Sequence, residues 1–162
     1  MSKKPKKARK LSARDKYDLW PRMTAIMRTI RCWKCEWCCH LYETGQREIA
    51  PRDYWGSTGG LNTHHYFGRT FWTTRYYFDN LVVLCYPHHM KFHAGDPDGK
   101  HEKWMKEKIG EGGYIKLARE AWRTDGKKRQ LLDEAEVQII EWEELIAQGP
   151  AAVKARLKEQ AE

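Results

Sequence analysis

The sequence has no long apolar run, no apolar signal-peptide core and no internal repeat. A membrane-spanning helix needs roughly 20 apolar residues, and a secretory signal needs an apolar core behind its charged start. We therefore expect a cytoplasmic protein that has no membrane partner. With 162 residues the chain is also too short for two independent hydrophobic cores, which predicts one compact centre with appendages.

A disulfide framework is a further feature that the sequence lacks. The five cysteines are an odd number, and four of them crowd into the phrase RCWKCEWCCH. Disulfides between such close neighbours would constrain little of the chain, whereas metal-bound thiolates in a reducing compartment fit the crowding. We expect the cysteines to bind a metal.

Acidic residues are scarce relative to basic ones over most of the chain. Residues 1–126 carry 24 Lys and Arg against 14 Asp and Glu, while residues 127–162 carry 6 against 8. The first part therefore favours a polyanionic partner such as DNA, although a solvated surface accounts for this charge equally well. Residues 1–11 are predicted to be a disordered basic arm that either tracks phosphates or only confers solubility.

The central elements follow from apolar spacing and from the positions of Pro and Gly. A helix is predicted between Ser12 and Arg31, interrupted or restarted at Pro21. Residues 43–60 end in GSTGG and indicate a loop, either a connector or a substrate-contact insertion. The phrases LNTHHYF and NLVVLC indicate two short strands, and YPHHMKFHAG indicates a helix that begins near Pro87 and ends at Gly95. The predicted order is strand, loop, strand, helix.

Three further helical segments are predicted beyond residue 100. They cover residues 104–109, 114–122 and 131–148, and Gly149 and Pro150 end the last one. This part is either a cover for the core or a partner-binding module. We therefore divide the chain into the arm of residues 1–11, a core of residues 12–100 and a helical extension of residues 101–162.

Five histidines stand between positions 64 and 93. Residues four apart share one face of a helix, so His89 and His93 can place two imidazoles on one metal. His64 on the neighbouring strand supplies a third nitrogen, and three ligands with open positions describe a catalytic metal site. His65 points to the opposite side unless the strand ends there, which lets it face a substrate.

This arrangement resembles the HNH endonucleases, whose ββα-metal unit has a doublet ending in His, an Asn before the second strand and a helix bearing the final His residues. The likeness covers about residues 30–95. It implies an α+β fold with a small ββα-metal core, a structural zinc site and flanking helices. It also implies that His64, His89 and His93 hold a divalent ion, with Mg²⁺ or Mn²⁺ favoured, although three imidazoles suit Zn²⁺ or Ni²⁺ as readily.

The same resemblance assigns the remaining site residues. It implies that His65 is the general base and that Asn80 braces the loop and orients His65. The phrase HHYFGRTFWTTRYYFDNLVVLC is also similar to a phage-encoded subgroup that includes NinG-type recombination endonucleases. In that subgroup one Arg follows the histidine doublet and another precedes the Asn, places that Arg69 and Arg75 fill here. Both are then expected to grip phosphate, and the alternative is that they are ordinary surface cations.

Many members of this family bind a structural zinc through two CxxC pairs. The first pair is ambiguous, because Cys32, Cys35 and Cys38 give two overlapping CxxC motifs. The phrase KCEWC resembles the family's KCExC, which implies Cys35 and Cys38. The second pair departs from the pattern, because Cys85 is followed by His88 where a cysteine is expected. A neutral imidazole is a good zinc ligand, so we predict a Cys₃His site.

A rival assignment gives the fourth zinc position to Cys32 or Cys39 and leaves His88 without a role. Either site would supply folding energy to the centre of the molecule. Removing the zinc should therefore unfold that centre.

These residues predict a metal-dependent DNA endonuclease, a phosphodiester hydrolase. His65 would take a proton from the water that attacks phosphorus in line, and the products would carry 5′ phosphates. If phage-encoded, the enzyme would work in the host cell cytoplasm. It would act as a monomer or a homodimer, and its substrate would be intact, branched or nicked DNA. The alternative is a zinc-stabilised DNA-binding or assembly protein without catalysis, which gives no reason for the histidines to stand together.

Histidines and aromatics outside this pattern are given simpler roles. We assign the aromatic residues between positions 66 and 78 mainly to packing, with stacking on unpaired bases as the alternative. His40 and His101 are predicted to be surface residues.

Overall fold

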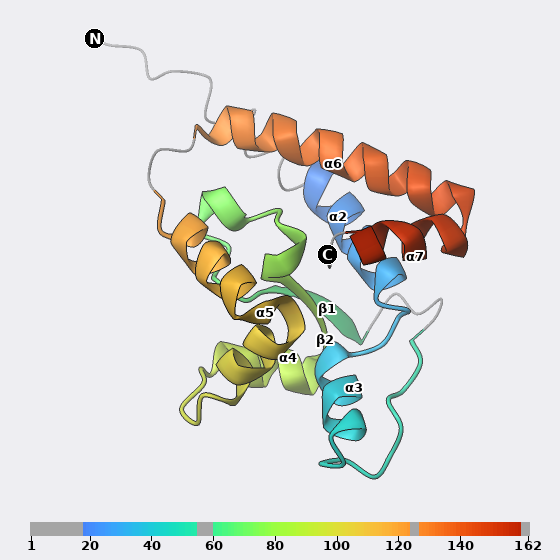
Figure 1. Cartoon of the computed structure of the whole chain (residues 1–162), viewed down its shortest axis with the longest axis vertical. Helices are drawn as coiled ribbons and strands as arrows, with labels where there is room; N and C mark the ends of the chain where they lie inside the picture. The colour runs from blue at the N-terminus through green and yellow to red at the C-terminus, as the bar shows by residue number, and fades with distance from the viewer. Residues whose placement is uncertain (1–17, 55–59, 124–126, 160–162) are drawn as a thin grey trace.

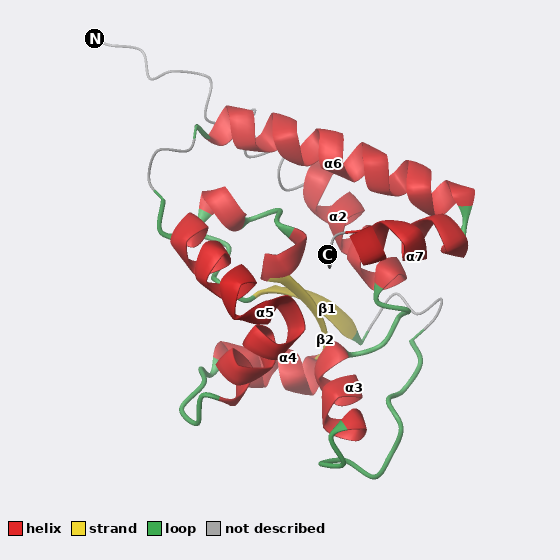
Figure 2. Ribbon diagram, in the orientation of Figure 1, coloured by secondary structure: helices red, strands yellow, loops and turns green. Residues whose placement is uncertain are grey.

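The structure, a computed structural model, has a small two-stranded sheet surrounded by helices (Figures 1 and 2). It describes residues 18–54, 60–123 and 127–159. The elements in chain order are α2 (Trp20–Ile30), α3 (Glu36–Glu43), β1 (Leu61–His65), η2 (Trp72–Thr74), η3 (Phe78–Asn80), β2 (Leu81–Cys85), α4 (Tyr86–His93), α5 (Lys100–Ala121), α6 (Lys128–Gln148) and α7 (Pro150–Glu159). The fold class is α+β, as predicted. The predicted arm of residues 1–11 and part of the predicted loop, residues 55–59, lie outside the described residues.

The sheet is an antiparallel hairpin that carries the histidine doublet. His64 lies opposite Val82 and His65 opposite Leu81. Successive side chains of a strand point to opposite faces. In agreement with this, the His64 ring meets His89 of α4, and the His65 ring meets Trp20 of α2. The two helices therefore cover the two faces, and β2 between them is buried along its whole length.

The predicted order of strand, loop, strand and helix is confirmed. Helix α4 begins directly after β2, with Pro87 in its first turn, where a missing N–H costs nothing. Helix α2 likewise has Pro21 in its first turn. Helix α3, which begins directly after Cys35 and contains Cys38, was not predicted.

Glycines divide the C-terminal helices. Gly110 has a φ of 75° and a ψ of 154°, so α5 consists of two helical pieces that meet at a kink. The predicted break between the helical segments 104–109 and 114–122 is therefore found at this kink. Gly149, with a φ of 105°, ends α6 as predicted, but the chain continues directly into α7, which was not predicted.

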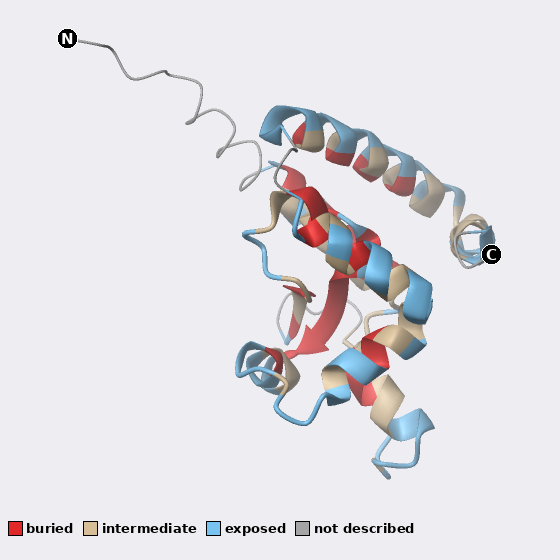
Figure 3. Cartoon of the chain, turned by 60° about the vertical axis from the view of Figure 1, so that its left-hand side comes forward, coloured by how far each residue is buried: buried red, intermediate tan, exposed pale blue. Residues whose placement is uncertain are grey.

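One hydrophobic core extends from the hairpin to α6. Figure 3 shows the buried residues of α6 on the side that faces the rest of the molecule. Its buried residues are Leu132, Ala135, Ile139 and Trp142. They belong to the same cluster as Met23 of α2 and Leu84 of β2. The domain division at residue 100 stays a prediction, although this cluster includes side chains from both sides of it.

An ion pair adds to the contact between α2 and α6. The Arg22 guanidinium donates to both carboxylate oxygens of Glu143, with N–O distances of 2.9 and 2.7 Å. Such bidentate geometry is the favourable form of a partly exposed ion pair.

Among the described helices we find no apolar stretch of the length that crossing a bilayer requires.

Candidate metal centres

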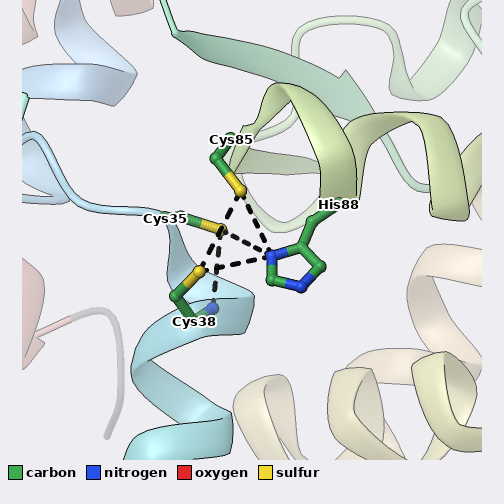
Figure 4. A group of neighbouring side chains, drawn as sticks. All are labelled: Cys35, Cys38, Cys85 and His88. Atoms are coloured by element: carbon green, nitrogen blue, oxygen red, sulfur yellow. Dashed lines mark hydrogen bonds between the residues drawn. The ribbon is translucent and has the colours of Figure 1, made fainter. Parts of the chain in front are cut away.

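Four side chains from two helix starts converge on one point (Figure 4). The Sγ atoms of Cys35, Cys38 and Cys85 and a ring nitrogen of His88 all lie within 4.8 Å of one another. His88 Nδ1 is 3.4, 3.3 and 3.3 Å from the three sulfur atoms, and the sulfurs of Cys38 and Cys85 are 4.0 Å apart. A tetrahedral zinc ion would separate two sulfurs by about 3.8 Å and a sulfur from a nitrogen by about 3.6 Å. The donors and their spacing therefore suit a metal such as zinc.

The two ligand pairs occupy equivalent places in their helices. Cys35 is the N-cap of α3 and Cys85 is the N-cap of α4, and Cys38 and His88 each follow three residues later. An N-cap side chain faces the third residue of its helix, so each pair meets by local geometry. The N–H of Cys38 also donates to Cys35 Sγ over 3.4 Å. Positive potential at both helix starts favours the thiolates that a metal requires.

Burial favours the uncharged forms of Cys35, Cys38 and His88. The three cysteines are 1–7% exposed. Burial raises the pKa of the Cys35 and Cys38 thiols and lowers the pKa of the His88 imidazole. Because thiolates are the metal-binding form, binding must release protons from the thiols. Metal affinity and proton release are therefore linked at this site.

The two remaining cysteines stand apart from the cluster. Cys32 is exposed and has a φ of 52°, and Cys39 is only partly buried. Neither belongs to the group of four. The structure therefore brings His88, and not the rival Cys32 or Cys39, to the fourth position.

Three imidazoles form a second group. His64 comes from β1, and His89 and His93 come from one face of α4, with ring nitrogens of all three within 4.8 Å of one another. The Nε2 atoms of His89 and His93 are 3.2 Å apart. The His64 ring centroid lies 5.2 Å from that of His89 and 4.7 Å from that of His93. Three nitrogen donors at this spacing suit a divalent metal that keeps further positions open.

Burial also prepares this group to bind a metal. Burial, together with the neighbouring His93 and His89, lowers the pKa of His64 to about 3. Burial and His93 lower the pKa of His89 as well. At neutral pH the His64 and His89 rings are therefore uncharged and have a lone pair to donate.

His65 is held by groups that the sequence did not predict. Its ring stacks on Trp20, with centroids 4.5 Å apart and planes inclined by 18°. Its Nε2 lies 3.1 Å from the backbone oxygen of Arg75. A carbonyl oxygen only accepts, so Nε2 donates, and in a neutral ring the lone pair then belongs to Nδ1. No sequence signal could reveal these partners, because each contact depends on how distant segments pack.

Asn80 braces the loop between the strands. Its side chain accepts from the N–H of Phe67 over 2.7 Å and donates to the carbonyl oxygens of Phe67 and Thr74, each over 3.0 Å. These bonds tie the two ends of the loop together. Among the contacts that the structure defines, Asn80 acts on His65 through the backbone. It binds the carbonyl of Thr74, and the next residue, Arg75, has the carbonyl that accepts the hydrogen bond from His65 Nε2.

Arg75 and Arg69 lie together in that loop. Arg75 Nη1 donates to the backbone oxygen of Arg69 over 2.7 Å, and the Arg75 guanidinium carbon is 4.8 Å from the centre of the Trp72 ring. The Arg69 side chain is exposed. Their role in phosphate binding stays a prediction.

An open cavity of about 1170 Å³ connects these residues. Because β1 ends at His65, the two neighbouring histidines reach the same cavity although they face different helices. The cavity is lined by His64, His65, Arg69, Arg75, His89 and His93, among others. All six were predicted from the sequence to belong to one site.

The assignment of His101 to the surface is wrong. Its ring stacks on Phe92 with centroids 3.8 Å apart, and its side chain is 14% exposed. His40 is half-buried, with its ring centroid 5.2 Å from that of Trp37. Both rings therefore pack in the aromatic cluster beside α3 and α4.

Comparison with models of known protein families, with curated proteins and with solved structures finds no match for this chain. A functional assignment therefore depends on the two ligand groups and on the cavity beside the three imidazoles.

Proposed function

We propose that this protein is a metal-dependent DNA endonuclease of the HNH type. One observation carries the proposal. Three imidazole donors, a fourth histidine whose Nε2 faces a backbone carbonyl, and two arginines line a single open cavity. A zinc-stabilised binding protein would need the cysteines but not this second constellation. The net charge of +8 adds general attraction for a polyanion.

His65 is the proposed general base. The Trp20 ring and the Arg75 carbonyl hold its imidazole in one plane and one tautomer. Its Nδ1 would take a proton from water as the water oxygen bonds to phosphorus and the bond from phosphorus to the 3′ oxygen breaks. The leaving oxygen gains a proton from solvent. The products therefore carry a 5′ phosphate and a 3′ hydroxyl.

The remaining residues of the cavity would position and neutralise the scissile phosphate. A divalent ion held by His64, His89 and His93 would supply positive charge beside the phosphate and leaving oxygens. Arg69 and Arg75 would add charge from the opposite loop. Asn80 would keep that loop, and with it the carbonyl that orients His65, in place.

Plasmid cleavage tests this proposal. The purified protein should nick or cut plasmid DNA with Mg²⁺ or Mn²⁺, and a chelator should stop it. A general base contributes about 10² to 10⁴ in rate, so His65→Ala should lose at least that much while it binds DNA like the wild type. His65→Asn, which keeps a planar side chain, should be equally inactive.

His40→Ala is the matched control. His40 is a half-buried histidine that lies outside the described cavity, so this variant should cut at the wild-type rate. Normal cleavage by both His65 variants would overturn the assignment of the base. Absence of cleavage by the wild type with Mg²⁺, Mn²⁺, Zn²⁺ and Ni²⁺ would overturn the nuclease and favour the non-catalytic DNA-binding protein.

A further inference from the structure

An exposed tryptophan stands beside the cavity. Of the seven tryptophans that the structure describes, Trp122 is the only exposed one, with 70% of its surface accessible. It lies at the C-cap of α5, and its ring centroid is 4.9 Å from that of Phe71. Their planes are inclined by 67°, so Phe71 supports the indole edge-on. Most of the indole surface is thus available to a ligand.

Neighbouring side chains extend this aromatic pair into a surface. Ile115 and Arg119 lie seven and three residues before Trp122, on the same side of α5, and both are exposed. Lys116 borders the same side. We define the Trp122 surface as Phe71, Ile115, Lys116, Arg119 and Trp122.

The charge of this surface is positive. Lys116 and Arg119 make no ion pair with any residue that the structure describes. The single acidic residue between positions 114 and 123 is Glu120, and its carboxylate pairs with Arg123 over 2.7 Å. An exposed aromatic ring among unpaired cations is the arrangement with which proteins bind single-stranded nucleic acid.

The Trp122 surface continues into the cavity through one short segment. Arg69, Thr70 and Trp72 line the cavity, and Phe71 between them contacts Trp122. A DNA strand with a phosphate at the three imidazoles would therefore pass this segment before it reaches the indole. The continuity and the positive charge favour a nucleic acid over an apolar protein partner.

We propose that Trp122 stacks on an unpaired base of the DNA substrate and that Arg119 contacts a phosphate of the same strand. This inference rests on the proposed function, because it takes DNA as the ligand of the adjoining cavity. It assigns the enzyme a substrate with unpaired nucleotides next to the cut. A base inside a continuous duplex has no face to offer the indole.

Binding of labelled oligonucleotides tests the proposal. The full-length zinc-loaded protein would be titrated into a single-stranded DNA and into the paired duplex of the same sequence, without added divalent ion. Loss of one stacked base weakens single-strand binding by about 5- to 150-fold, so Trp122→Ala should show this loss and Trp122→Phe should recover most of it. Duplex binding should change less than twofold. Arg119→Gln should lower the slope of log K against log salt by about 0.7 for the single strand.

Tyr42→Ala is the control, because Tyr42 is an exposed aromatic residue on α3 that lies outside the described cavity. It should bind both DNAs like the wild type. Wild-type binding of the single strand by Trp122→Ala, or equal losses for the two DNAs, would overturn the proposal, and circular dichroism would confirm that each variant is folded. The binding result is independent of cleavage. If Trp122→Ala selectively loses single-strand binding and the wild type cuts no DNA, the result would support the role of the Trp122 surface and contradict the proposed nuclease.

Discussion

At the residue scale, His88 is the position where the predicted zinc site departs from four cysteines. Its Nδ1 lies 3.3–3.4 Å from all three sulfurs. With zinc, three thiolates and one neutral imidazole leave a net charge of −1, whereas four thiolates would leave −2. The smaller charge is less costly to bury. An imidazole therefore suits a site whose three cysteines are buried.

Substitution of His88 tests this assignment. Loss of a residue that only hydrogen-bonds to a metal ligand typically lowers metal affinity by roughly 10- to 100-fold. His88→Ala removes a ligand itself and should lower zinc affinity by more than that. His88→Cys restores a fourth donor and should keep one zinc per chain. Metal content by mass spectrometry and the absorption of the Co²⁺-substituted protein would measure both effects.

Cys39→Ser is the matched control for this experiment. Cys39 lies next to Cys38 in sequence but is outside the ligand group, so its loss should leave the metal content unchanged. The assignment fails if His88→Ala keeps its zinc and Cys39→Ser loses it.

At the element scale, Glu36 joins the first turn of α3 to three other segments. Its Oε1 lies 2.6 Å from Lys108 Nζ of α5 and 3.2 Å from Arg31 Nε at the end of α2. Its Oε2 accepts from the N–H of Val83 in β2 over 2.6 Å. Burial alone would raise the pKa of this carboxyl, but Lys108 and Arg31 bring it below the usual value. This network holds the helix of the first cysteine pair against the hairpin that carries Cys85.

Glu36→Gln should therefore be strongly destabilising. Removal of one partner from a buried ion pair costs about 3–5 kcal/mol, because the other charge stays buried without compensation. Addition of Lys108→Met to the variant should recover part of the loss. Urea unfolding of the zinc-loaded proteins would measure both differences.

Glu107→Gln provides the comparison on α5, the helix that carries Lys108. Glu107 pairs with Lys103 over 4.0 Å and is 51% exposed, so its substitution should cost less than about 1 kcal/mol. Equal costs at Glu36 and Glu107 would show that the network adds nothing beyond an ordinary surface pair.

At the scale of the whole molecule, α6 completes the core rather than standing apart from it. Leu132 and Ile139 are fully buried and Trp142 is 2% exposed. The Trp142 ring lies 5.0 Å from that of Phe78, which precedes β2. This packing favours core covering over a separate partner-binding module for α6.

Truncation before α6 should therefore unfold the protein. Each large buried apolar side chain contributes about 1.5–3 kcal/mol, so the loss of these three approaches the roughly 5–15 kcal/mol of a whole domain. A chain that ends at Gly149 lacks residues 160–162 and α7, which has no fully buried residue, and should stay folded with a lower melting temperature. Thermal melts of the two truncations provide the comparison. A folded, cleavage-competent chain that lacks α6 would contradict the role of this helix in the core.

Local chemistry made much of the candidate site predictable. The spacing of His89 and His93 brings these two imidazoles together through helical geometry alone, whereas the choice of Cys35 and Cys38 depended on the resemblance of KCEWC to KCExC. The short apolar run LVVLC between Asn80 and Pro87 predicted a strand. The order of these signals was enough to predict strand, loop, strand and helix.

Contacts between distant segments were decided only by the tertiary structure. Trp20 on His65, the Arg75 carbonyl on Nε2 and Glu36 between Lys108 and Arg31 each join residues whose spacing has no local periodicity. The choice of His88 over Cys39 likewise required α3 and α4 to be placed against each other. Sequence periodicity reports which side chains share a face, whereas the packing of faces depends on the shapes of all the buried side chains together. The sequence by itself therefore determined which groups could bind metal. The packed core decided which of these groups meet and which residues hold His65 beside them.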